Sequence, residues 1–290
     1  MNKIEKPVTR TPATPCWILH ERARQHSWKG TGWLSIKTFR NGRAYYDVGT
    51  GHHTVDDDSY LVLNDGETYS INIESRDPVE SFCLFFAPGF AEEVRRSVSI
   101  NPETLLDEPD PDEKAPIRFF EKNYPHDRVL SPAFFSLRRG YTQHETDWLV
   151  EQFHGIIERL LTVHRIACTE SKRLDAIRPA TREEIYRRVC RARDYASALF
   201  AEPITLAELA RAACLSPNHL LRTFRQVFGQ TPHQFLVTRR LQEARRLLAH
   251  DDLPITTVCF AVGFESLGSF SSLFRKRFGL SPSEYRHAKK

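Results

Sequence analysis

One stretch of the sequence gathers residue types that could hold a metal ion. His52 and His53 are adjacent and are followed by Asp56, Asp57 and Asp58. Imidazole and carboxylate groups are common metal ligands. Adjacent strand residues point to opposite faces, so the two histidines cannot easily share one ion, and a turn or surface cluster is the simpler interpretation. The chain has no Ser-His-Asp or Cys-His nucleophile arrangement and no GxxxxGK[ST] phosphate loop. We therefore expect no catalytic residue, no metal and no cofactor.

A second set of residues could hydrogen-bond to DNA bases. Asn218 and Arg222 stand four positions apart, and Arg225 follows. Arginine can donate two hydrogen bonds to guanine O6 and N7, and asparagine can pair in the same way with adenine N6 and N7. This chemistry requires a helix that presents the three side chains on an exposed face.

The surrounding residues predict such a helix as the second half of a helix-turn-helix pattern. Thr205 and Glu208 form a capping box that begins a short helix, and Cys214-Leu215 makes the turn. Ser216 then caps a longer helix with proline at its first position, and Gly229 ends it. The apolar stripe of this longer helix consists of Leu220, Phe224, Val227 and Phe228.

The same pattern occurs a second time about fifty residues later. FRQVFGQTP at 224–232 is repeated as FRKRFGLSP at 274–282. Ile204-Thr205 aligns with Ile255-Thr256, and Ala210 aligns with Ala261, so we expect the turns to differ in length by one residue. The helix predicted between the two units, 232–249, spans about 27 Å. One turn of duplex DNA is about 34 Å, so two recognition helices, about 217–228 and 267–278, could enter successive major grooves.

The final 110 residues resemble the AraC/XylS transcription regulators. The segments that carry the resemblance are ITLAELA, LSPNHLLRTFRQVFGQTP, RRLQEARRLLAHDDLPIT and VCFAVGFESLGSFSSLFRKRFGLSPSEYR. The resemblance implies two helix-turn-helix units joined by a helix, a cupin-like N-terminal regulatory domain, and double-stranded DNA and RNA polymerase as partners. We expect a transcription activator, and the sequence itself leaves open whether the outcome is activation or repression.

The exposed helix faces and the resemblance together give the candidate DNA-binding residues. In the first recognition helix these are Asn218, His219, Leu221, Arg222, Arg225 and Gln226, and in the second they are Leu267, Gly268, Ser269, Ser271, Ser272, Arg275 and Lys276. The short hydroxyls of the second helix make less selective contacts than arginine or asparagine. We therefore expect this helix to bind mostly the DNA backbone, through Arg275, Lys276 and Arg277.

Residues 30–86 predict an antiparallel β sandwich or barrel. Asn41-Gly42 and Asn64–Glu67 are hairpin signals, and Asp77-Pro78 predicts a further turn. The aromatic residues of this region either line a pocket for a small-molecule effector or fill the core; they are Trp33, Tyr45, Tyr46, Tyr60, Tyr69 and Phe82. A short helix is expected at 90–98, and a loop at 101–116.

A helix predicted at 145–168 carries an apolar stripe with two interpretations. The stripe consists of Leu149, Phe153, Ile156, Ile157, Leu160, Leu161 and His164. It is either the seam of a homodimer through 145–164 or the face by which this helix packs on the sheet of its own subunit.

Composition and charge divide the chain into two parts. The 290 residues carry a net charge of +4, but from residue 181 onward 18 Lys and Arg stand against 10 Asp and Glu, a balance of +8. We expect an α+β fold with a regulatory domain at 1–170, a linker at 171–180, and an all-α DNA-binding domain at 181–290 that begins with a capping box of Thr181 and Glu184. The six scattered cysteines suit free thiols in a reducing cytosol, and neither a membrane segment nor a secretion signal is evident. A cytoplasmic protein is expected.

These observations favour a sequence-specific, non-enzymatic regulator of transcription whose N-terminal domain senses an effector, dimerises, or both. One rival is a metal-dependent cupin enzyme fused to a DNA-binding domain. A second rival is a protein-interaction or RNA-binding module. The metal content of the purified protein would test the first rival, and a competition assay between duplex DNA and duplex RNA would test the second.

Overall fold

A computed structural model describes residues 16–49, 51–99, 116–175, 178–250 and 253–289. The chain separates into two units between Lys172 and Arg173. The first unit combines a β-sheet with helices and the second is helical throughout, so the α+β fold is confirmed. None of the helices in the described ranges has both the length and the apolar character needed to cross a membrane.

The first unit begins with strands and ends with helices. Its strands are β1 (Cys16–Thr31), β2 (Ser35–Arg40), β3 (Ala44–Val48), β4 (Gly51–Val55), β5 (Ser59–Leu63), β6 (Thr68–Phe86) and β7 (Asn123–Pro125). Its helices are α1 (Phe90–Ser99), α2 (Ser131–Gly140) and α3 (Thr146–Ser171). Helix α1 confirms the helix expected at 90–98, whereas α2 was not predicted. The loop expected at 101–116 lies outside the described residues except for residue 116.

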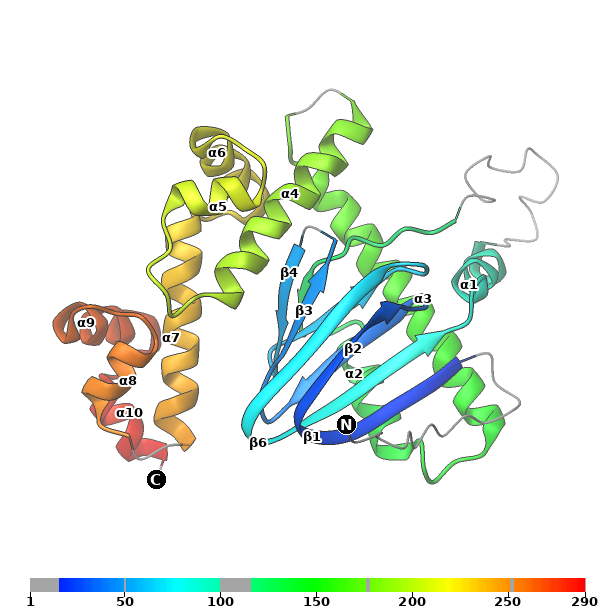
Figure 1. The fold of residues 1–290 in the computed structure, drawn as a ribbon, viewed down its shortest axis with the longest axis horizontal. Helices are drawn as coiled ribbons and strands as arrows, with labels where there is room; N and C mark the ends of the chain where they lie inside the picture. The colour runs from blue at the N-terminus through cyan, green and yellow to red at the C-terminus, as the bar shows by residue number, and fades with distance from the viewer. Residues whose placement is uncertain (1–15, 50, 100–115, 176–177, 251–252, 290) are drawn as a thin grey trace. The chain divides into compact units, whose positions relative to one another are not determined.

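The long strands β1 and β6 organise the sheet. They pair antiparallel along almost their whole length. On its other edge β6 pairs first with β3 and then, nearer its end, with β2. Strand β4 extends the sheet from β3, while β5 and β7 extend it from β2. All pairings are antiparallel, and the strands curve into a nearly closed barrel-like sheet (Figure 1).

Both predicted hairpins are wrong, because another strand lies between the strands that were expected to pair: β6 lies between β2 and β3, and β2 lies between β5 and β6. Asn41 and Gly42 do take positive φ values of 60° and 154°. However, β2 and β3 each pair with β6 and not with one another, and β5 pairs with β2 and β7 and not with β6. Turn signals report local backbone conformation, and they do not identify the strand that occupies the neighbouring position.

The turn predicted at Asp77-Pro78 is also wrong, since β6 continues through it. The ladder between β1 and β6 shifts between the pairs Ala23–Val79 and Gln25–Glu74. Residues 75–78 therefore form an irregular bulge in which Pro78 has no ladder hydrogen bond to donate. Strand β1 was not predicted, because its middle, HERARQH, lacks a simple alternation of apolar and polar residues.

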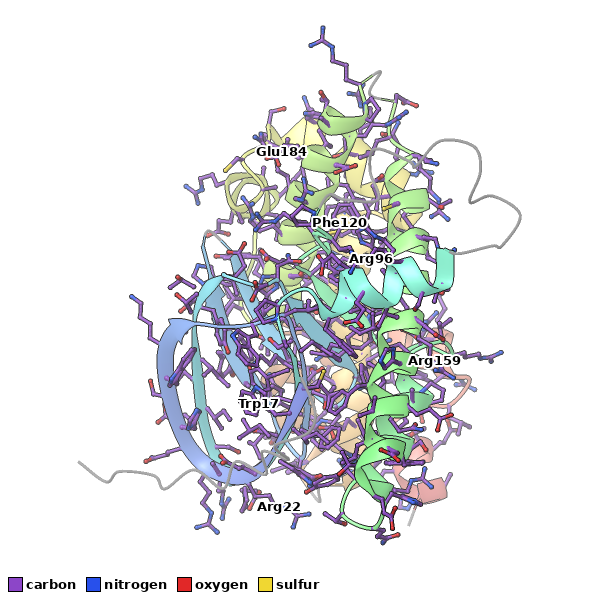
Figure 2. All side chains as sticks on the ribbon, turned by 90° about the vertical axis from the view of Figure 1, so that its right-hand side faces the viewer. Trp17, Arg22, Arg96, Phe120, Arg159 and Glu184 are labelled. Atoms are coloured by element: carbon purple, nitrogen blue, oxygen red, sulfur yellow. The ribbon has the colours of Figure 1, made fainter. Side chains whose placement is uncertain are left out.

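Side chains of the sheet alternate between two cores, one on each face. Phe39, Cys83 and Phe85 belong to the inner core. Leu84 and Phe86 belong to the outer core, which α1, α2 and α3 cover. Figure 2 shows α1 and α3 along this face of the sheet.

The outer core settles the two interpretations of the apolar stripe on α3. Leu149, Phe153 and Leu160 are buried with the residues of the sheet. The ring of Phe153 meets that of Phe86 edge-on, with 5.8 Å between centroids. The stripe therefore packs on the sheet of its own subunit.

The second unit consists of seven helices in the described part of the chain. They are α4 (Pro179–Ala198), α5 (Leu206–Ala212), α6 (Pro217–Phe228), α7 (Pro232–His250), α8 (Ile255–Ala261), α9 (Leu267–Phe278) and α10 (Pro282–Lys289).

The capping box predicted at Thr181 and Glu184 is wrong, because α4 begins two residues earlier. Pro179 occupies the start of the helix, and Arg178 at the cap position makes no side-chain capping bond. A proline there loses no helical hydrogen bond. Glu184 instead accepts a hydrogen bond from Nε of Arg188, one turn later, at 2.8 Å. Within the second unit, the segment before α4 contacts α6, since Nη1 of Arg173 donates to the carbonyl oxygen of Val227 at 3.2 Å.

Lys37 is an unusual member of the inner core, because its side chain is buried and cationic. Its Nζ donates to Oη of Tyr69 at 3.1 Å and lies 3.7 Å from the ring centroid of Phe85. Burial lowers the pKa of Lys37 to about 8. The hydroxyl and the aromatic ring therefore compensate the ammonium only partly for the water that it loses on folding.

We predict that Lys37→Met raises the free energy of unfolding at pH 7. The folded-state pKa of Lys37, about 8, lies below the unfolded value, so the unfolded chain binds more protons between about pH 8 and 10.5, and stability rises with pH across that window. The difference corresponds to an energy on the order of 3 kcal/mol. The variant should be more stable at pH 7 and should lose the rise.

The measurement is urea unfolding at pH 7 to 10.5 followed by tryptophan fluorescence, since all four tryptophans lie in the first unit. Lys29→Met, which removes an exposed lysine from β1, is the control. A Lys37→Met variant with the pH dependence of the native protein would contradict the assignment.

Candidate nucleic-acid interface

Helices α5 and α6 form the first helix-turn-helix unit with the caps that the sequence predicts. Thr205 Oγ1 accepts from the backbone N–H of Glu208 at 3.2 Å, and the Glu208 carboxylate accepts from the backbone N–H of Thr205 at 2.8 Å. This capping hydrogen bond from the Thr205 backbone lowers the pKa of Glu208. Ser216 caps α6, and Gly229 ends it in the left-handed conformation.

Helices α8 and α9 form the second unit with equivalent ends. Ser266 Oγ accepts from the backbone N–H of Ser269 at 3.4 Å, and Gly279 ends α9 with a φ of 80°. Helix α8 differs from α5, since it follows Pro254 and lacks a side-chain cap.

The alignment of the two first helices needs a correction. Thr205 precedes α5 as Pro254 precedes α8, an offset of 49 residues and not 51. Ala210 is accordingly buried, whereas Ala261 is exposed. The positive-φ residue of the turn is Cys214 in one unit and Gly263 in the other. Two residues, Leu215 and Ser216, separate this position from α6, whereas three residues, 264–266, separate it from α9. The second helix-turn-helix unit therefore has one extra residue after the turn.

A repeated set of aromatic contacts holds the inner faces of α6 and α9. Phe224 meets Phe228 at 4.7 Å between centroids and Phe235 of α7 at 5.9 Å. Fifty residues later Phe274 meets Phe278 at 4.6 Å and Tyr285 of α10 at 5.7 Å. Phe224 and Phe274 are completely buried. Each recognition helix is thus attached to the helix that follows it.

Arginines cover the outer phenylalanine of each set. The guanidinium of Arg193 in α4 lies 5.2 Å from the Phe228 centroid, and that of Arg245 in α7 lies 5.3 Å from the Phe278 centroid. Helix α7 therefore packs on the second helix-turn-helix unit in the way that α4 packs on the first. Figure 1 shows α6 beside the upper end of α7 and α9 at a lower level along it. Its 19 residues correspond to about 28 Å.

The face of α6 opposite the phenylalanines is polar and open. Asn218, Leu221, Arg222 and Arg225 are exposed, and His219 and Gln226 are half-buried. Gln226 differs from the others, because its Nε2 already donates to the Asp175 carboxylate. Asn218, Leu221, Arg222 and Arg225 therefore share the face that could meet DNA, and their base contacts stay a prediction.

The outer face of α9 is open as well but chemically simpler. Leu267, Gly268, Ser269, Ser272, Arg275 and Lys276 are exposed, and Ser271 is half-buried. Arg277 is also exposed and follows directly. Arg275 lies close enough to Glu284 to contribute to the lowering of that carboxyl's pKa, which results mainly from the capping bond of the Ser281 backbone N–H. The three consecutive cations make the end of α9 the most basic part of the second unit's recognition helix.

The structure divides the aromatic residues that were candidates for effector binding. Tyr46 and Tyr69 meet in the inner core, with 5.8 Å between centroids. Tyr60 lies in the outer core, where its hydroxyl donates to Asp127 at 2.8 Å. Trp33 and Tyr45 are exposed. The five side chains therefore do not line one pocket, and an effector role for any of them stays a prediction.

His52 and His53 belong to strand β4, so the turn, one of the two expected alternatives of turn or surface cluster, is wrong. They point to opposite faces, as adjacent strand residues must: His52 is exposed and binds Asp47, whereas His53 is buried. Nowhere in the described ranges do three His, Cys, Asp or Glu side chains gather in the way that a metal ion requires.

Comparison with known proteins connects the helix-turn-helix geometry to a family. A family model described as a helix-turn-helix domain matches residues 209–288. The arabinose operon regulatory protein of Escherichia coli K12 is 33% identical over 136 residues, covering 47% of each chain. Residues 209–288 of this chain thus belong to an AraC/XylS-type helix-turn-helix domain. The transcriptional activator RhaS of Escherichia fergusonii is 40% identical to this chain over 90 residues, 31% of this chain and 32% of RhaS.

A third relative extends the same comparison. The probable transcriptional regulator LumQ of Photobacterium leiognathi is 37% identical over 83 residues, 29% of this chain and 34% of LumQ. The matches cover between about a third and a half of the length of these relatives. The matched family model lies within the AraC/XylS-type domain and does not include the β-sheet of the first unit.

The turns of this AraC/XylS-type domain make a prediction about two glycines. A Cβ added to Gly263 would lie 2.5 Å from the carbonyl oxygen of Ala201, whereas one added to Gly279 would meet no atom within 4 Å. Both residues have positive φ. Gly279→Ala should therefore lower the free energy of unfolding by only about 1–2 kcal/mol, the cost of holding alanine in the left-handed conformation. Gly263→Ala should cost about 3 kcal/mol, at the upper end of common single substitutions, because the backbone of Ala201 must also move.

Thermal unfolding followed by far-UV circular dichroism compares the two variants at the helical unit. Gly279→Ala serves as the matched control, because it has the same backbone requirement without the steric contact. Equal losses of stability would show that the turn is not packed against Ala201.

Proposed function

We propose that this protein is a sequence-specific DNA-binding regulator of transcription that works without catalysis. The observation that carries the proposal is the pair of matched helix-turn-helix units, each with a buried aromatic face and an exposed polar face. The family match of the C-terminal unit and its similarity to proteins named as transcriptional regulators support the same conclusion.

In this proposal α6 and α9 enter successive major grooves. The estimated length of α7, about 28 Å, is comparable with one turn of duplex DNA, about 34 Å. On α6, Arg222 would donate two hydrogen bonds to guanine, Asn218 would pair with adenine, and Leu221 would contact a thymine methyl. On α9, Ser269 and Ser272 would make short contacts, and Arg275 and Lys276 would bind phosphates.

The N-terminal unit, which contains the β-sheet, would regulate this binding to DNA. We propose that it takes up a small-molecule effector, which can change DNA affinity only if it binds one state of the protein better than the other. A homodimer through 145–164 would have to use the outer face of α3, because the apolar stripe is covered by the sheet.

Two further parts of the proposal follow from DNA binding. RhaS is named an activator, and an activator bound beside a promoter would contact RNA polymerase. A regulator of genes must also reach the chromosome, and we therefore propose a cytoplasmic location.

We predict that Arg222→Ala and Arg275→Ala weaken DNA binding in different ways. Loss of Arg222 should cost about 1–3 kcal/mol on the preferred sequence and relax the preference at one base pair. Loss of Arg275 should weaken binding to all sequences similarly and lower the salt slope by about one.

The experiment selects bound fragments from a random duplex pool and then measures affinity by fluorescence anisotropy at several salt concentrations. Arg96→Ala is the matched control, since it removes an exposed arginine from α1 of the first unit (Figure 2). An Arg222 variant with unchanged base preference would remove this residue from base recognition. Absence of any sequence preference in the native protein would overturn the proposed function.

A further inference from the structure

The first unit contains a cavity between its sheet and helix α2. Its volume is about 190 Å³, and its walls include Arg40 of β2, Glu80 and Phe82 of β6, and Phe134 and Arg138 of α2. An engineered protein cavity of about 150 Å³ binds benzene. A cavity of this size can therefore hold one small molecule with a single ring or a short branched chain.

The charged wall of the cavity is built on a row of three paired strands. Arg40, Glu80 and Arg22 are direct neighbours across β2, β6 and β1. The Glu80 carboxylate bonds Nε2 of His20 at 2.9 Å, and accepts from Arg138 Nη1 at 2.9 Å and from Arg22 Nη2 at 3.3 Å. Burial opposes ionisation of this carboxyl, but the hydrogen bonds from His20 and Arg22 lower its pKa overall. Glu80 is therefore ionised, and both of its oxygens already accept hydrogen bonds.

Guanidinium donors in the cavity wall remain unused by the contacts with Glu80. The Arg40 guanidinium makes no hydrogen bond or ion pair with any residue in the described ranges, although it lines the cavity. Arg138 gives one donor to Glu80, and a guanidinium has five. The second carboxylate of the lining, Asp57, accepts the backbone N–H of Asn41 at 3.1 Å. Two arginines and two acids line this space, and Arg40 is the lining cation that has no protein partner among the described residues.

The remaining walls are aromatic. Phe82 and Phe134 are buried, and Phe135 is partly exposed. The ring of His126 lies 5.4 Å from that of Phe135, and its Nδ1 bonds Oγ of Ser131 at 2.9 Å. Burial lowers the pKa of His126, so this ring is neutral near pH 7. An apolar body would lose water on these walls without burying a further charge.

We propose that this cavity binds a small organic carboxylate. The apolar body lies against Phe82 and Phe134, and the carboxylate pairs with Arg40 and Arg138. Two oxygens of a carboxylate match the paired N–H groups of a guanidinium. A bound anion would connect β2 to α2, which no residue pair described above does directly. Ligand binding does not depend on the proposed DNA function, but an effect of the ligand on DNA binding does.

The test measures binding of cyclohexanecarboxylate, phenylacetate and 3-methylbutanoate to the full chain by isothermal titration calorimetry. The corresponding neutral amides have nearly the same shape and no charge. We expect at least one acid to bind at least tenfold more tightly than its amide. Equal binding of acids and amides, or no binding of any acid at 10 mM, would overturn the proposal.

Two arginine variants locate the site. Arg40→Gln should weaken the acid at least tenfold and leave its amide unchanged, and the fold should persist because Arg40 is exposed and unpaired in the described structure. Arg24→Gln removes an exposed arginine from β1, outside the lining residues, and should bind the acid normally. An equal loss in both variants would indicate attraction by net charge and would contradict this site.

The DNA-binding assay then separates the two proposals. A bound acid that changes DNA affinity in the native protein, but not in Arg40→Gln, would support the cavity as an effector site. Acid binding without a change in DNA affinity would support the cavity as a binding site and remove its link to regulation. Failure of the protein to bind DNA at all would overturn the proposed function and leave the carboxylate site standing.

Discussion

The attachment of each recognition helix by two phenylalanines is the constraint on which the helical unit depends. Phe224 and Phe228 lie one turn apart on α6, as Phe274 and Phe278 do on α9, and each pair contacts an aromatic residue of the next helix. Because the two rings are buried on one side of the helix, the opposite side faces solvent or a binding partner. The direction in which Arg222 or Arg275 points is therefore determined by hydrophobic packing and not by the arginine itself.

The helical unit was predictable because its signals are local. Helix caps, a left-handed glycine and apolar residues spaced four positions apart all act within a few residues. Helices α5 to α10 begin and end close to the positions that these signals predict. The alignment of α8 failed for a specific reason. Gly263 occupies the left-handed position of its turn, but Cys214 occupies it in the first unit, and cysteine carries no sequence signal for that conformation.

The sheet was less predictable because its pairings are not local. Strand β6 takes the place beside β2 and β3 that turn chemistry alone would give to each other. Pro78 resembles a strand terminator, yet a bulge accommodates it. The cavity was invisible for the same reason. Arg40, Glu80 and Arg138 come from three distant segments, and they gain chemical meaning only when the strand register and α2 place them together.

The distribution of arginine partners explains why net charge was a useful but incomplete guide. Inside the helical unit arginines have structural roles: Arg193 binds Asp194, and Arg240 donates to the carbonyl oxygens of Phe200 and Glu202. On the recognition helices Arg222 and Lys276 make no such bonds among the described residues. The positive balance of the C-terminal part therefore includes arginines that the fold itself uses. Arg222 and Lys276 instead stay available on the helix faces opposite the phenylalanines, where a phosphate backbone would compensate their charge.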